Sequence, residues 1–160
     1  MKRFRYENGP LDRTDINLLQ ALTEDGRTSI AELARLVGLS APSVSERLKR
    51  LEEAGIVTGY AAKIDLAALG RPVSAWVRIR PIAGKLKEAS EILRGIPEIV
   101  SCDRITGEDC FLAKVQVAEI ADLEPVIDAI NPVAATNTSI IQTTLISPRL
   151  PGLADVAERS

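Results

Sequence analysis

The stretch SIAELARLVGLSAPSVSERLKRLEEAG, residues 29–55, predicts two short helices joined by a tight turn. Ser29 and Glu32 have the spacing of a capping box, in which a hydroxyl and a carboxylate each satisfy a backbone N–H that the first helical turn leaves unpaired. Over residues 30–37, apolar side chains recur at the i, i+3, i+4 and i+7 positions, so they share one helix face. This spacing predicts the first of the two helices.

A turn and a second helix follow directly. Gly38 can adopt the left-handed conformation that ends a helix, and Ser40 can cap the next one. Pro42 falls in the first turn, where its missing N–H costs nothing, and Gly55 ends the helix predicted over residues 41–54. The whole stretch is therefore predicted to form a helix-turn-helix.

The predicted second helix has an apolar side and a polar side. Val44, Leu48 and Leu51 fall on the apolar side. The polar side has short side chains at its start and basic ones in its middle, and it comprises Pro42, Ser43, Glu46, Lys49, Arg50 and Glu53. Such a face can enter the DNA major groove, because short residues allow close approach and Arg or Lys reaches base edges or phosphates. The alternative is an ordinary helical hairpin whose charges are merely solvated.

An earlier helix is expected to complete a three-helix core. Asp12 stands at its N-cap position, Leu11 is placed to pack against Ile16, and the helix ends near residues 25–26. The predicted core comprises Ile16, Leu19, Leu22, Leu33, Val37, Val44, Leu48 and Leu51.

The segments on either side of this core show no helical periodicity. Residues 1–10 are interpreted as a flexible arm, and residues 58–64 as a short extended linker strand. Arg71-Pro72 punctuates the chain, so we place the domain boundary there.

Composition limits the classes of function. The chain has 160 residues, 46% of them hydrophobic, which is enough for packed cores, and its net charge of −2 provides no general basic field for nucleic acid. Residues 27–63 contain six Lys or Arg against four Glu, a local charge of +2. A unit with so little positive charge is expected to bind DNA as a dimer or a larger assembly.

Several classes of site are not expected. The two cysteines, Cys102 and Cys110, are too few for a disulfide framework, and there is no histidine to share a metal with them. No apolar run is long enough to span a bilayer, and no apolar segment follows the basic residues near the N-terminus. We therefore expect a cytoplasmic protein with no metal site and no membrane partner.

The second half of the chain changes to strand-like alternation. Residues 73–80, 99–106, 110–117 and 138–147 are predicted strands, and residues 85–95 and 120–130 are predicted helices. This order, βαββαβ, predicts a ferredoxin-like sheet with both helices on one face, so the whole chain is α+β. The other face would carry Trp76, the only tryptophan, and we expect a second copy of the chain to cover that face or its edge.

Three stretches in this order resemble the Lrp/AsnC, or feast/famine, family of prokaryotic transcription regulators. They are LDRTDINLLQALTEDGR, SIAELARLVGLSAPSVSERLKRLEEAGIVTGY and ITGEDCFLAKV, and the resemblance covers residues 11–147. It implies a winged helix-turn-helix DNA-binding domain at residues 11–72, a ligand-binding and oligomerisation domain at 73–147, and a tail at 148–160. It also implies dimers that assemble further, often to octamers, on double-stranded DNA with palindromic-type sites. The implied effector is an amino acid held between subunits, with no cofactor.

The resemblance also assigns the residues that contact DNA. By position in the family's motif these are Arg27, Pro42, Ser43, Ser45, Arg47, Lys49 and Arg50. Arg47 lies on the flank of its helix, so a structural ion pair with a neighbouring carboxylate is an equal alternative.

A second set of residues matches the family's effector site. Gly107, Glu108 and Asp109 match the effector loop, where glycine allows backbone N–H groups to face a ligand carboxylate and an acidic side chain can hold an ammonium group. The remaining predicted members are Cys110, Asn137, Thr138 and Ser139. The alternative for the loop is a plain hairpin turn. Cys110 stands where the family often has an acidic residue, and Asn131-Pro132 is a second departure, so the effector stays unspecified.

Two other classes of function compete with the regulator. Some haem-pathway decarboxylases resemble the same two-domain fold, but this sequence has no histidine and no paired nucleophile and base, so we do not expect an enzyme. An architectural DNA-binding protein without an effector is the other alternative.

Overall fold

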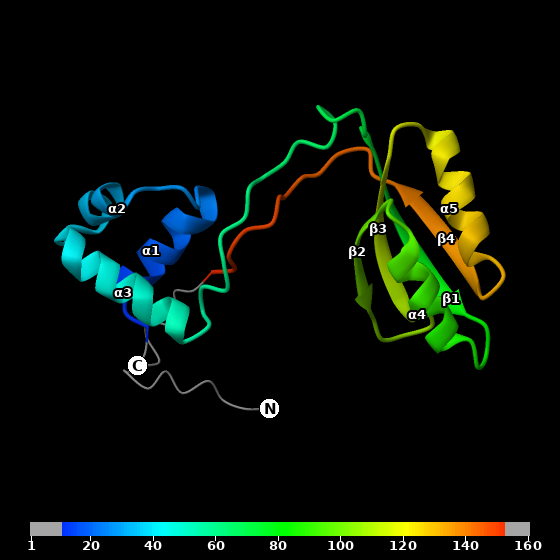
Figure 1. Cartoon of the computed structure of the whole chain (residues 1–160), viewed down its shortest axis with the longest axis horizontal. Helices are drawn as coiled ribbons and strands as arrows, with labels where there is room; N and C mark the ends of the chain where they lie inside the picture. The colour runs from blue at the N-terminus through cyan, green and yellow to red at the C-terminus, as the bar shows by residue number, and fades with distance from the viewer. Residues whose placement is uncertain (1–10, 153–160) are drawn as a thin grey trace. The chain divides into compact units, whose positions relative to one another are not determined.

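The computed structural model describes residues 11–152, which form two compact units, one of residues 11–63 with 146–152 and one of residues 64–145 (Figure 1). The predicted arm at residues 1–10 and the end of the predicted tail, 153–160, lie outside the described residues. The predicted boundary at Arg71-Pro72 lies inside the second unit, because that unit begins at residue 64.

The first unit is helical. Its helices are α1 (Arg13–Glu24), α2 (Ile30–Val37) and α3 (Ala41–Glu53). Asp12 caps α1 in a capping box, because its carboxylate accepts from the Asp15 N–H at 2.8 Å and its own N–H donates to the Asp15 carboxylate at 3.2 Å. Only half of the box predicted at Ser29 forms. Ser29 accepts from the Glu32 N–H, but the Glu32 carboxylate lies 3.7 Å from Arg35 instead.

A small apolar core joins the three helices. Its buried members are Leu18, Leu19, Leu33, Ala34, Val44, Leu48 and Leu51. Leu18, which is fully buried, was absent from the predicted core, and Leu22 and Val37 are only half-buried at its edge. Leu150 from the predicted tail also packs against this cluster. The linker strand predicted over residues 58–64 is wrong, because these residues adopt irregular backbone with no strand partner in the described part of the unit.

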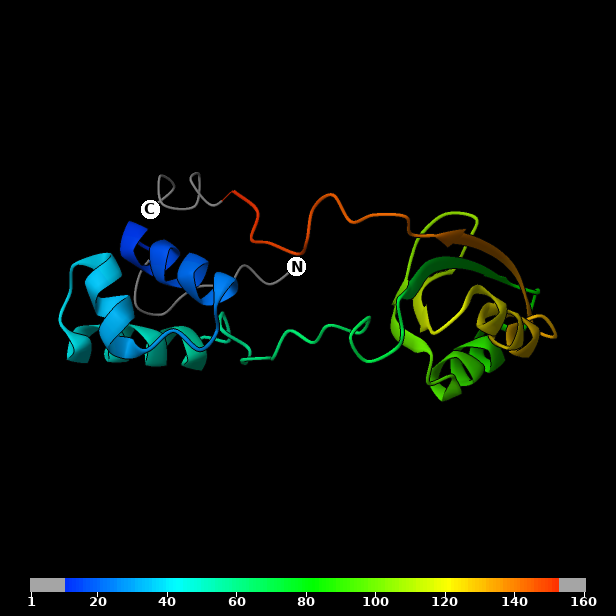
Figure 2. The same ribbon diagram turned by 90° about the horizontal axis from the view of Figure 1, so that it is seen from above.

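The second unit is a four-stranded antiparallel sheet with order β2-β3-β1-β4, as predicted for a ferredoxin-like fold. Its elements are β1 (Val73–Pro81), α4 (Leu86–Gly95), β2 (Ile99–Arg104), β3 (Phe111–Val117), the 3-10 turn η1 (Ile120–Asp122), α5 (Leu123–Ile130) and β4 (Ala134–Ile140). Figures 1 and 2 show α4 and α5 against one face of the sheet. The helix predicted over residues 120–130 begins as the 3-10 turn η1 and continues as α5, with Pro125 in the first turn of α5.

Alternation along β1 separates the two faces of the sheet. Ala75, Val77 and Ile79 are buried under the helices, whereas Trp76 is half-buried and Arg78 and Arg80 are exposed on the open face. This alternation agrees with the prediction for the first strand.

The last strand lies earlier than the predicted residues 138–147. Ala134 pairs with Pro81 and Ile140 pairs with Ala75, and the final ladder bond runs from the Ile141 N–H to the Ser74 carbonyl at 2.8 Å. Beyond that point β1 has ended, so residues 142–147 have no strand to pair with. The predicted effector residues Asn137, Thr138 and Ser139 therefore lie within β4.

Candidate DNA-binding and effector sites

The helix-turn-helix forms as its end signals predict. Gly38 closes α2 with a φ of 69°, the left-handed conformation that glycine adopts without steric cost. The Ser40 hydroxyl accepts from the Ser43 N–H at 3.4 Å and caps α3, and Pro42 lies in the first turn of that helix. Three buried residues of α3, Val44, Leu48 and Leu51, fix which side faces outward.

The outward side of α3 carries most of the predicted DNA contacts. Pro42, Ser43, Ser45 and Lys49 are exposed. Lys49 lies 3.7 Å from Glu53, but both side chains are solvated, so this pair leaves the ammonium group available. These residues therefore form one accessible polar surface.

Arg47 has a different environment. One of its terminal nitrogens lies 2.7 Å from the Asp12 carboxylate and 2.8 Å from the Asp15 carboxylate, and the Asp15 side chain is only 3% exposed. The hydrogen bonds to Asp15 and Asp12 raise the pKa of Arg47. Burial opposes ionisation of Asp12, but the Asp15 N–H and Arg47 outweigh it, so the pKa of Asp12 falls below its ordinary value of 3.8. The structural alternative for Arg47 is thus the arrangement observed, and we call Arg47, Asp12 and Asp15 the α1–α3 ion cluster.

The other two predicted basic contacts differ in burial. Arg50 is half-buried in the last turn of α3, and its Nε has no hydrogen-bond partner among the described residues. Arg27 is exposed in the turn after α1, where its N–H donates to the Asp25 carboxylate at 2.8 Å. Its guanidinium forms no ion pair within residues 11–152, so it is available to bind a DNA phosphate.

The predicted effector loop lies at the end of β1. Gly107 has a φ of 113°, a conformation that favours glycine, so the turn needs this residue type. The Glu108 carboxylate lies 2.6 Å from Arg80, and the Asp109 carboxylate lies 3.4 Å from the same guanidinium. We call Arg80, Glu108 and Asp109 the loop ion cluster. It is open to solvent, since the side chains of Arg80 and Glu108 are 53% and 82% exposed.

Only part of the predicted effector set shares this surface. Asn137 pairs with Arg78 and Ser139 pairs with Trp76, so both belong to the open face. Thr138 pairs with the buried Val77 and therefore faces the helices, which corrects its placement in the same pocket. Cys110 is half-buried and packs against the buried core of this unit. For Thr138 the reason is the register of β4 with β1, which sends neighbouring residues to opposite faces. Cys110 lies just before β3, outside the paired residues.

Sequence reasoning missed Arg80. The signal was present, because a ferredoxin-like sheet places its first and third strands side by side, and the end of β1 then meets the turn before β3. The Cys110 N–H donates to the Ile79 carbonyl at 3.0 Å, which fixes this approach.

Comparison with known families agrees with both halves of the molecule. Residues 11–58 match the winged helix-turn-helix DNA-binding family, and residues 74–151 match the Lrp/AsnC ligand binding domain. The chain is 37% identical over 145 residues to the HTH-type transcriptional regulator LrpA of Mycobacterium tuberculosis, covering 89% of this chain and 97% of LrpA. The chain belongs to the Lrp/AsnC family. It is a helix-turn-helix transcription regulator, as its sequence predicted.

Solved structures of Lrp/AsnC regulators have the same fold. Bacillus subtilis LrpC superimposes with a TM-score of 0.81 at 32% identity, over 88% of this chain and all of that one. A Neisseria meningitidis transcriptional regulator in complex with L-methionine also gives 0.81 at 32% identity, over 91% of this chain and 98% of its own.

Residues 11–152 contain neither a membrane-spanning helix nor a metal-binding cluster. No helix there has the length and apolarity to cross a membrane. Within the same residues, no group of three or more His, Cys, Asp or Glu side chains could hold a metal ion.

Proposed function

We propose that this Lrp/AsnC regulator binds palindromic-type DNA sites through the outward side of α3, and that an amino acid held at the loop ion cluster changes that binding. The observation that carries the DNA part is the polar, solvent-facing surface of Pro42, Ser43, Ser45 and Lys49 on a helix whose other side is buried. Short residues at the start of α3 allow close approach to base edges, and Lys49 supplies a charge for a phosphate.

The roles of the arginines follow from their surroundings. Arg27 and Arg50 have guanidinium groups that no carboxylate of the described residues neutralises, so both are proposed DNA contacts. Arg47 is proposed to orient α3 on α1 through Asp12 and Asp15, and to reach DNA only with the part of its guanidinium that stays exposed.

The test is a fluorescence anisotropy titration of the full chain on the DNA upstream of its own gene. Lys49→Ala is expected to weaken binding similarly on all sequences and to lower the salt dependence by about one unit of slope per chain in contact. The matched control is Lys87→Ala, an exposed lysine of the sheet unit. Equal effects of the two variants would refute the DNA surface.

The loop ion cluster supports the effector part. Its two carboxylates and one guanidinium offer partners for both charged groups of an amino acid, and Asn137 and Ser139 add an amide and a hydroxyl to the same open face. The L-methionine complex of the Neisseria meningitidis regulator makes an amino acid the class to test first. The Glu108 and Asp109 carboxylates already contact Arg80. A bound ligand therefore has to share these carboxylates with Arg80 or displace its guanidinium.

A thermal-shift screen of the twenty amino acids measures this directly, since a ligand that binds the native state raises Tm. At least one amino acid is expected to raise Tm for the wild type and not for Asp109→Asn. A screen in which no amino acid raises Tm or changes DNA binding would favour the architectural alternative.

The open face also supports self-association. Trp76 pairs with Lys114 on one neighbour and Ser139 on the other, so an apolar ring lies half-buried among polar groups. We infer that a second copy covers this face or its edge, giving a dimer that assembles further. Sedimentation showing only monomer at micromolar concentration would remove this inference.

A further inference from the structure

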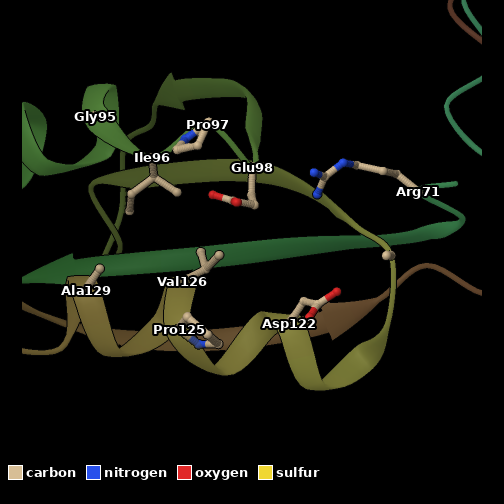
Figure 3. Close-up of a pocket in the computed structure, with 10 residues that line it drawn as sticks. Arg71, Gly95, Ile96, Pro97, Glu98, Asp122, Pro125, Val126 and Ala129 are labelled. Atoms are coloured by element: carbon tan, nitrogen blue, oxygen red, sulfur yellow. The ribbon is translucent and has the colours of Figure 1, made fainter. Parts of the chain in front are cut away.

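The sheet unit contains a second site candidate, a cavity of about 440 Å³ between the end of α4 and the start of α5 (Figure 3). Its volume falls in the range of small-molecule sites in proteins. Three charged residues, Arg71, Glu98 and Asp122, line it together with the apolar Ile96, Val126 and Ala129. None of these residues belongs to the α1–α3 ion cluster or the loop ion cluster.

Two of the three charged side chains that line this cavity have no partner among the described residues. Neither Arg71 nor Glu98 forms an ion pair or a side-chain hydrogen bond within residues 11–152, although both line the same space. Glu98 is half-buried, whereas Arg71 and Asp122 are exposed. Asp122 uses one carboxylate oxygen to accept from the Glu119 N–H at 3.0 Å and keeps the other free. The cavity therefore offers one cation and two anions, with no protein partner for Arg71 or Glu98.

The apolar and charged groups are separated in space. Figure 3 shows Arg71 and Asp122 toward one end, the Glu98 carboxylate and Val126 near the middle, and Ile96 and Ala129 toward the other end. A ligand that fits this order has a carboxylate for Arg71, an ammonium group for Glu98 and an apolar side chain for the far end. We propose that this cavity binds an α-amino acid with an apolar side chain, as a second site separate from the loop ion cluster.

Two hydrogen bonds hold the backbone of Arg71 in place. Its carbonyl accepts from the Gln116 side-chain amide, and its N–H donates to the Leu66 carbonyl at 2.9 Å. Gln116 is one of only two buried polar or charged residues among those described, and its carbonyl oxygen accepts from the Ser74 hydroxyl. The buried amide of Gln116 thus fixes the end of the segment that leads into β1.

The two sites lie at opposite ends of β1. Arg71 precedes the strand, whereas Arg80 is near its end, and the cavity uses residues of the helix-covered side. The proposed cavity site shares its ligand class with the proposed effector site but does not depend on it.

The test is hydrogen exchange on the full chain, with and without L-methionine, L-leucine, L-isoleucine or L-valine. At least one of them is expected to protect amides of residues 95–99 and 118–126 in the wild type and in Asp109→Asn. Glu98→Gln and Arg71→Gln are expected to weaken this binding about tenfold or more, since each removes a charge-assisted hydrogen bond. N-acetyl-L-methionine and L-methionine methyl ester, which each lack one charge, should bind more weakly than L-methionine by a similar factor.

Matched controls come from α4. Glu91→Gln and Arg94→Gln change the same charges at exposed positions that do not line the cavity, and they should leave the protection unchanged. Wild-type Tm in the Glu98→Gln variant without ligand will show that the fold is intact. Protection that persists in Glu98→Gln, or that none of the four amino acids produces, overturns the cavity site. Loss of protection at residues 105–110 in Asp109→Asn reports separately on the effector loop.

Discussion

The two units each contain an arginine between two carboxylates, and the surroundings of the two clusters differ. In the α1–α3 ion cluster the side chains of Arg47 and Asp15 are 25% and 3% exposed, whereas in the loop ion cluster those of Arg80 and Glu108 are 53% and 82% exposed. A desolvated pair is costly to break because one partner is left charged and buried. An exposed pair contributes little to stability, and water or a ligand can replace either partner. The same chemistry therefore fixes the position of a helix in one unit and is available for binding in the other.

The largest expected effect is loss of the buried carboxylate. Asp15→Ala should lower the free energy of unfolding of the helical unit by about 2 to 3 kcal/mol, because Arg47 keeps only the more exposed Asp12 as a partner. Trp76, the only tryptophan, lies in the sheet unit, so its fluorescence reports that unit, while circular dichroism follows helices in both. The prediction is a lowered circular dichroism transition with an unchanged fluorescence transition. Glu46→Ala, at an exposed position of α3, should change neither by more than about 0.5 kcal/mol.

The contribution of Asp12 to the stability of the helical unit is expected to depend on pH. Because folding lowers the pKa of Asp12, the unfolded chain binds its proton more readily, and the carboxylate stabilises the fold at pH values above 3.8. This contribution is lost as the pH falls through the lower folded pKa. Asp12→Asn should therefore be less stable than the wild type at neutral pH, and the difference should shrink below about pH 4. A difference independent of pH would show that the charge of Asp12 contributes nothing.

The smallest expected effect concerns the exposed cluster. Glu108→Gln should change the free energy of unfolding of the sheet unit by less than about 1 kcal/mol, and added salt should reduce that change further. Trp76 fluorescence during urea unfolding measures it. A loss of stability as large as that of Asp15→Ala would mean that both clusters are structural.

Local signals explain what the sequence could predict. Gly38, Ser40 and Asp12 act within a few residues of themselves, so the helix ends and the helix-turn-helix were predictable. The partners of Arg47 lie 35 and 32 residues away, which is why sequence alone left its role open. The face of Thr138 and the ends of β4 depend on the register with β1, which the weak strand pattern of the Ala-Thr-Asn run does not specify.

We propose that the loop ion cluster responds to ligand while the α1–α3 ion cluster holds α3 in place. The most direct test is the anisotropy titration on the chain's own upstream DNA, with and without the amino acid that most raises Tm, for the wild type and for Glu108→Gln combined with Asp109→Asn. We predict that the variant binds DNA within about twofold of the wild type without ligand and has lost the ligand-induced change. A ligand-induced change of wild-type size in the variant would contradict the account.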